Sequence, residues 1–127
     1  MKQGLFLDDE RKVSQVTWVK YPNDIQWTVV RSYDAFVDAV KQYHAAGYTY
    51  DVFSFDHDLS FDHYTDVGDK IDYNKREKTG YHAAVWLTHF YDSNRIDKEP
   101  EFYIHTMNPV GKDNIYRHMF YWMQNKF

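Results

Sequence analysis

The sequence predicts a small α/β domain in which helices flank a mostly parallel sheet. Two continuous apolar runs, at residues 5–7 and 52–55, each stop abruptly at a group of acidic residues. Such runs are typical of strands that are buried on both faces, as in parallel sheets covered by helices. Helical patterns lie between the strands, and this alternation implies right-handed crossovers within one sheet.

Two further strands are predicted at residues 28–31 and 102–105, and no clear fifth strand follows them. Helices are predicted over 34–46, over 80–91 and from residue 108 onward, because apolar side chains recur there at helical spacing.

Capping signals mark the ends of these helices. Ser32 and Thr79 are N-cap residue types, and Asn108 is followed by a proline at the first helical position. Gly47 is a suitable stop for the first helix.

The remaining segments are connections. Residues 12–27 lack a helical stripe; we expect an extra short strand at 17–19 and a turn at 22–24. Residues 60–78 form a polar, acidic segment without periodicity, and loops of this length are usually functional lids or partly mobile.

Composition favours one folded domain over residues 1–127. Of the 127 residues, 43% are hydrophobic and 20% aromatic, which is far from the composition of a disordered segment. No linker or internal repeat divides the chain. The absence of cysteine excludes disulfide scaffolds, thiolate metal sites and cysteine nucleophiles.

Charge and hydropathy narrow the choice of partners. The net charge is −4, and the acidic excess lies between residues 51 and 78. Duplex DNA binding is not expected from a chain without a basic excess, whereas a small phosphorylated ligand or a protein partner is compatible. The apolar stretch near residue 5 is too short for a signal peptide or a membrane span, so we expect a cytoplasmic protein that makes no membrane contact.

Polar residues follow three of the predicted strands, where open parallel sheets bind ligands. They are Asp8, Asp9, Glu10 and Arg11 after the first strand, Asp56, His57 and Asp58 after the third, and His105, Thr106 and Asn108 at the end of the fourth. The topology brings these distant groups to one edge. An acidic pair after a single strand is commonly only a turn or a cap, but three such strand ends favour a site.

Clustered carboxylates repel one another unless they take up protons or share a cation. Asp8, Asp9 and Asp56 are therefore the predicted ligands of a divalent metal, with Mg²⁺ suited to oxygen ligands and Mn²⁺ allowed by the nearby imidazoles. Such an ion would neutralise phosphate charge. His57 and His105 are the candidate general acid and base, and Asp58 would orient a histidine.

Other residues are candidates for binding phosphate, each with an ordinary alternative. Arg11 is either a phosphate clamp or a member of a surface ion pair. Thr79 and Gly80 begin a helix whose free N–H groups suit phosphate, although threonine is also a common cap. His105 could equally be a core histidine with its hydrogen bonds satisfied. Four histidines are assigned to surface or packing roles, namely His44, His63, His89 and His118.

The acidic pair Asp8-Asp9, Asp56 after the central strand and Thr106 after the next strand resemble the receiver domain of response regulators. In that family the acidic residues bind Mg²⁺, the central aspartate accepts a phosphoryl group and the Thr/Ser senses it. The chain departs from this pattern: residues 12–27 replace the first helix, and the receiver's lysine at the end of a fifth strand has no counterpart.

A closer resemblance is to the cyclic-phosphate processing receiver-like domains, a divergent relative of that family. The matching blocks are Leu7-Asp8-Asp9-Glu10-Arg11, Phe55-Asp56-His57-Asp58-Leu59, Thr79-Gly80-Tyr81 and His105-Thr106-Met107-Asn108-Pro109-Val110-Gly111, followed by Asn114-Ile115. The resemblance implies a receiver-like (flavodoxin-like) fold and metal-assisted processing of a cyclic phosphate on a nucleotide or a nucleic-acid end.

Three hypotheses follow. The first, which we favour, is an enzyme: a metal-dependent phosphoesterase that acts on the cyclic phosphate of a nucleotide-like substrate, with Arg11, Thr106 and Asn108 holding the phosphate. The second is a non-catalytic nucleotide- or protein-binding module, such as a sequestering or inhibitory factor. The third is a phosphoacceptor receiver. Fold alone does not decide among them.

Overall fold

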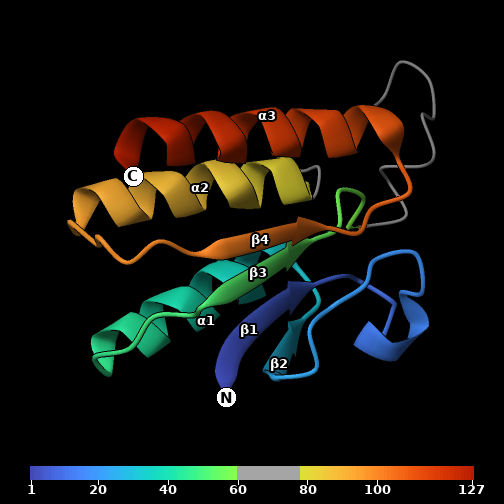
Figure 1. The fold of residues 1–127 in the computed structure, drawn as a ribbon, viewed down its shortest axis with the longest axis horizontal. Coiled ribbons are helices and arrows are strands. Elements are labelled where there is room, and N and C mark those ends of the chain that lie inside the picture. Colours follow the sequence, from blue (N-terminus) through green and yellow to red (C-terminus); the bar gives the residue numbers. More distant parts are fainter. Residues whose placement is uncertain (60–77) are drawn as a thin grey trace.

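Four parallel strands form the sheet in the computed structural model, which describes residues 1–59 and 78–127. They are β1 (Lys2–Leu7), β2 (Ile25–Val30), β3 (Val52–Phe55) and β4 (Glu101–Ile104). Their order in the sheet is β2-β1-β3-β4, and all arrows in Figure 1 point the same way. The predicted parallel sheet is confirmed, with no fifth strand among the described residues. The predicted loop over 60–78 lies outside the described residues, apart from Lys78.

Three helices connect and follow these strands, each close to its predicted position: α1 (Tyr33–Ala45), α2 (Gly80–Ser93) and α3 (Pro109–Lys126). Their N-caps are Ser32, Thr79 and Asn108, whose side-chain oxygens accept backbone N–H groups of the first turn. The chain leaves α1 through Gly47, whose φ of +93° lies in the left-handed region that glycine tolerates.

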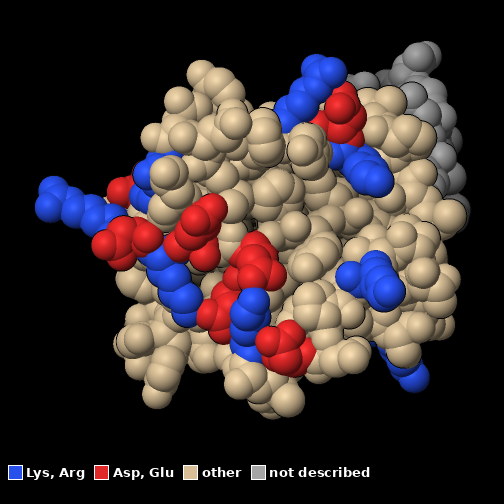
Figure 2. Space-filling model, viewed as in Figure 1, with Lys and Arg blue, Asp and Glu red and all other residues tan. Residues whose placement is uncertain are grey.

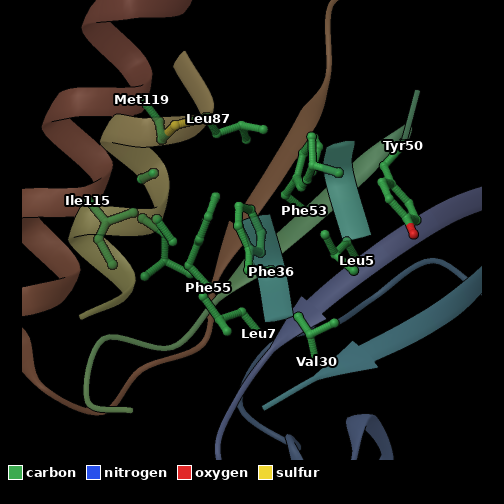
Figure 3. Packing of buried hydrophobic residues seen from close by; sticks show 14 of the residues in the cluster. Leu5, Leu7, Val30, Phe36, Tyr50, Phe53, Phe55, Leu87, Ile115 and Met119 are labelled. Atoms are coloured by element: carbon green, nitrogen blue, oxygen red, sulfur yellow. The ribbon is translucent and has the colours of Figure 1, made fainter. Parts of the chain in front are cut away.

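All three helices belong to the apolar core on one side of the sheet. Phe36 of α1 points between Phe53 and Phe55 of β3, with ring centroids 6.0 and 5.7 Å away (Figure 3). The helix α2 adds Leu87 to this core, and α3 contributes Ile115. The buried sheet residues that face these helices are Leu5, Leu7, Val30, Phe53, Phe55 and Ile104.

The connection from β1 to β2 crosses the other face of the sheet, where a helix would cover an ordinary receiver. It contains one short 3-10 helix, η1 (Val13–Gln15), and a turn before β2. The prediction of a short strand at 17–19 is wrong, because these residues are irregular. The side chains of this segment contact the sheet, and its backbone forms no ladder with a strand. For example, the indole N–H of Trp18 donates to the carbonyl of His105 at 2.8 Å.

The edge at which the strands begin is held by ion pairs. Lys2 of β1 contacts Glu101 of β4 at 2.5 Å, and Lys98 contacts Asp51. Acidic and basic side chains accordingly lie next to one another on the face shown in Figure 2. Across the described ranges, no helix is long and apolar enough to cross a membrane.

Candidate metal and phosphate site

The ends of β1, β3 and β4 place Asp8, Asp56 and His105 beside one another. The ladder continues one residue past the strands, because the N–H of Asp56 donates to Leu7 at 2.9 Å and that of His105 to Phe55 at 3.0 Å. All three side chains are buried, with at most 3% of the residue exposed. Residues separated by almost the whole chain thus meet at one sheet edge.

This trio could hold a metal ion. One carboxylate oxygen from each aspartate and one ring nitrogen of the histidine all lie within 4.8 Å of one another. Asp8 Oδ2 is 3.1 Å from Nε2 of His105, so the imidazole is aimed at the carboxylates. Two carboxylates with one imidazole suit Mn²⁺ and other transition metals and also admit Mg²⁺.

The two buried carboxylates differ in their proton affinity. Burial acts to raise the pKa of Asp8, but hydrogen bonds from His105 and from the N–H groups of Arg11 and Glu10 outweigh it and lower the pKa to about 2. Burial, followed by the charge of Asp8, raises the pKa of Asp56 to about 7. Burial also lowers the pKa of His105, so its ring is neutral at neutral pH. His105 therefore supplies no positive charge to balance the two carboxylates.

Arg11 supplies part of that charge. Its guanidinium lies 3.5 Å from Asp8 Oδ2 and 3.9 Å from Asp56 Oδ2, longer than hydrogen bonds. The same guanidinium lies over the Trp18 indole, 5.2 Å from the ring centroid, and keeps a third of its side chain exposed. Arg11 is thus oriented toward the carboxylates without being locked onto either, which leaves it able to bind an anion.

A cleft of about 310 Å³ opens beside this trio, with Arg11 at its wall. Five polar residues line it, together with the apolar Met107 and Pro109: Arg11, Asp56, Asp58, Thr106 and Asn108. Thr106 makes a side-chain hydrogen bond to Asp56. The carboxylate of Asp58 is held at both oxygens, by His57 Nδ1 at 3.0 Å and by the amide of Asn108 at 3.4 Å. The cleft therefore presents a cation, two carboxylates, a hydroxyl and an amide to a ligand.

Two glycines allow the helix ends to approach the site. A Cβ on Gly80 would lie 1.6 Å from the carbonyl oxygen of Asp56, and one on Gly111 would lie 2.3 Å from Cγ of His57. The start of α2 is therefore packed against the β3 end, and the His57 ring lies on the first turn of α3. Both glycines are required by space, since any side chain would displace Asp56 or His57.

A family model described as the cyclic-phosphate processing receiver domain matches residues 3–120. The chain belongs to this family. No curated protein and no solved structure matches the chain.

This cyclic-phosphate processing receiver domain gathers the predicted metal ligands only in part. Asp8 and Asp56 meet as predicted in space, while Asp9 is half-buried and lies outside the trio. Burial, then the charge of Asp8, raises the pKa of Asp9. His105, predicted as an acid or base, occupies the third position and is engaged by Asp8.

The backbone N–H groups of Thr79 and Gly80, at the start of α2, both have hydrogen-bond partners within the chain. The N–H of Gly80 donates to the carbonyl of His57 at 2.9 Å, and the N–H of Thr79 donates to Nδ1 of His82 at 3.0 Å. These contacts fasten α2 to the β3 end. Thr79 and Gly80 thus shape the receiver domain's site, and a phosphate contact from this helix start stays a prediction.

Three residues beside the receiver domain's trio are absent from the sequence-based prediction. Ser54 accepts or donates a hydrogen bond with His105 Nδ1 at 2.7 Å, Tyr21 bonds Ser54 at 2.6 Å, and Trp18 bonds the His105 carbonyl. The signal for Ser54 was its hydroxyl within the otherwise apolar run of β3. Tyr21 and Trp18 carried no periodic signal, because they belong to the irregular connection.

Proposed function

We propose that this receiver domain is a metal-dependent phosphoesterase that opens a cyclic phosphate on a nucleotide or a nucleic-acid end. The buried trio of Asp8, Asp56 and His105 next to Arg11 carries this proposal. The family description supports the cyclic phosphate as the group that is processed. Mg²⁺ and Mn²⁺ are the ions that we expect to serve the site.

Different residues of the cleft would bind different parts of the phosphate. Arg11 would donate to the non-bridging oxygens, and the Asn108 amide and the Thr106 hydroxyl would fix their orientation. A divalent ion held by Asp8, Asp56 and His105 would neutralise phosphate charge and polarise phosphorus. Met107, which is 67% exposed at the cleft, gives the nucleoside an apolar surface.

The pair of Asp58 and His57 would handle the protons. Water attacks phosphorus, a new P–O bond forms, one P–O bond of the ring breaks, and the released oxygen takes up a proton. Asp58 faces the cleft and shares a hydrogen bond with His57, so the proton lost by the water can pass to this pair. His57 thereby keeps its predicted acid-base role, now through Asp58.

Hydrolysis of cyclic nucleotides tests this function. We expect 2′,3′-cyclic or 3′,5′-cyclic nucleotides to be opened with Mg²⁺ or Mn²⁺, and Asp56→Asn to lose at least a hundredfold in rate. Asp38→Asn, an exposed carboxylate on α1, is the matched control and should keep full activity. Metal binding without turnover across this panel rejects the phosphoesterase. Tight nucleotide binding without product would instead support the non-catalytic binding module.

A phosphoacceptor receiver is the second candidate, favoured by the bond between Thr106 and Asp56 at the end of the central strand. In this case acetyl phosphate should add one phosphoryl group to Asp56. Intact mass spectrometry detects that addition, and Asp56→Asn should abolish it. An unchanged mass rejects this candidate.

A further inference from the structure

A buried row of polar groups runs behind the trio, on the face of the sheet opposite the helices. It begins at Asp8, whose Oδ2 lies 3.1 Å from Nε2 of His105. Nδ1 of the same ring lies 2.7 Å from Oγ of Ser54, which lies 2.6 Å from the Tyr21 hydroxyl. These contacts join β1, β4 and β3 to the irregular connection that crosses this face.

The direction of each hydrogen bond in this row follows from its two ends. A carboxylate oxygen accepts hydrogen bonds, so in the contact between Asp8 and His105 it is Nε2 that carries the proton and donates. Nδ1 is then an acceptor, and Ser54 must donate to it. The Ser54 oxygen in turn accepts from Tyr21, whose pKa burial raises to about 12, so that its hydroxyl keeps its proton.

The residue His105 is also held at one face of its ring and at its backbone. The Phe6 ring stacks on it at a centroid distance of 4.3 Å and an angle of 6°. Trp18 holds its carbonyl, and neither Ser54 nor His105 is exposed. A ring so enclosed cannot turn to find a new partner, and the group that faces Nδ1 decides which of its tautomers are tolerated.

We propose that Ser54 and Tyr21 are positioning residues that hold His105 through Nδ1 and keep Nε2 aimed at the carboxylates of Asp8 and Asp56. This inference rests on the proposed metal site. A carbonyl or carboxylate at the position of Ser54 could only accept from Nδ1, whereas a hydroxyl can donate or accept. The site therefore accommodates both neutral tautomers of His105.

Both tautomers are needed if His105 is to serve with and without a metal ion. Without an ion, Nε2–H donates to Asp8; with one, Nε2 must be free of its proton and Nδ1–H must donate to a partner. The imidazole keeps one proton throughout, because the proton on Nε2 leaves to solvent and another arrives from solvent at Nδ1. Ser54 and Tyr21 keep their own protons, and only their O–H bonds turn, that of Ser54 toward Tyr21.

Nitrogen NMR of the full chain, labelled with ¹⁵N-histidine, reads out this arrangement without any catalysis. In the metal-free protein we expect His105, assigned through the His105→Gln spectrum, to be the Nε2–H tautomer. Ser54→Ala should move its Nδ1 resonance downfield, to the position of a nitrogen with a free lone pair. An unmoved resonance in Ser54→Ala, or Nδ1–H in the metal-free wild type, overturns the inference.

Calorimetric titration with Mn²⁺ measures the consequence for metal binding. We expect Ser54→Ala to weaken binding 10- to 100-fold, the usual effect of removing the outer partner of a ligating histidine. Tyr21→Phe, which removes only a hydroxyl, should weaken it by up to about tenfold. Tyr103→Phe is the matched control, since its ring packs on Tyr21 at 5.2 Å and its hydroxyl is not in the row, and it should bind as wild type.

The NMR experiment and the Mn²⁺ titration together separate a failure of this inference from a failure of the proposed function. Normal Mn²⁺ affinity in both Ser54→Ala and Tyr21→Phe overturns the positioning role and leaves the metal site intact. If wild type binds no metal while the Nδ1 resonance still moves in Ser54→Ala, the metal-dependent function fails and the hold on His105 is supported.

Discussion

Asp56 is the residue on which the proposed chemistry depends most. It contacts Thr106, its carboxylate lies near Arg11, and the neighbouring charge of Asp8 makes its ionisation costly. A carboxylate raised to a pKa of about 7 is half-protonated at neutral pH, and a divalent ion would compete with that proton. Proton binding and metal binding would thus be linked at one side chain.

The contribution of Asp56 to stability should therefore fall as the metal-free protein is taken from pH 4 to pH 8. The folded state keeps a proton on Asp56 that the unfolded chain loses above its ordinary value of 3.8, so the folded form is favoured at low pH and this advantage is lost as pH rises through 7. Three pKa units correspond to at most about 4 kcal/mol. Urea unfolding in a chelator should show this decline in wild type and in Asp38→Asn. In Asp56→Asn stability should decline less over this range than in wild type, and an equal decline would assign the effect to another group, such as Asp9.

At the scale of elements, the site is built by helix starts that touch strand ends. Gly80 brings α2 onto the carbonyl of Asp56, and Asn108 both caps α3 and donates to Asp58. The caps that begin these helices therefore also fix the geometry of the cleft. Changes at the start of α2 or α3 should disturb stability and the site together.

Gly80→Ala should destabilise the fold by at least about 3 kcal/mol, because the new methyl group would overlap a backbone oxygen that cannot move aside. Gly47→Ala is the comparison. That position has nothing within 4 Å and only its φ of +93° to oppose a side chain, so its cost should be nearer 1 kcal/mol. Chemical unfolding measures both, and equal costs would show that α2 shifts to relieve the overlap.

Asn108→Ala should lose about 1 kcal/mol of stability and also the cyclic phosphate activity. Ser32→Ala removes the corresponding cap of α1, away from the cleft, and should lose similar stability while it keeps its activity. Unfolding midpoints and initial rates, measured on the same preparations, make this comparison. Full activity in Asn108→Ala would remove the side chain from the site.

At the scale of the whole molecule, the helices and the functional edge are separate features. The helices share one side of the sheet, the irregular connection covers part of the other, and the site lies where three strands end (Figure 1). An ion bound at that edge would bridge three strands that come from distant parts of the chain. Metal binding should therefore raise the stability of the entire fold.

We expect Mn²⁺ or Mg²⁺ to raise the free energy of unfolding, by about 2.7 kcal/mol at a concentration 100 times the dissociation constant. Thermal unfolding with and without the ion measures this, with Asp8→Asn as the variant that should not respond. A similar gain in Asp8→Asn would place the ion elsewhere.

Much of this architecture could be predicted because its signals are local. The apolar runs, the caps at Ser32, Thr79 and Asn108, and the polar strand ends are all readable from short stretches. The third member of the candidate metal trio could not be predicted in this way. Choosing His105 over Asp9 depends on which side chain turns inward beyond its strand. The far-face row was missed since Tyr21 reaches Ser54 only through tertiary packing.

The position of Trp18 has an optical consequence. Of the four tryptophans in the chain, it is the one whose indole lies under the guanidinium of Arg11 and holds the backbone of His105. If Arg11 leaves the ring to bind a phosphate, as proposed, the electric field at the indole should change, and the emission maximum with it. Titrating a variant that keeps only this tryptophan should follow ligand binding by fluorescence, and Arg11→Ala should abolish the spectral shift.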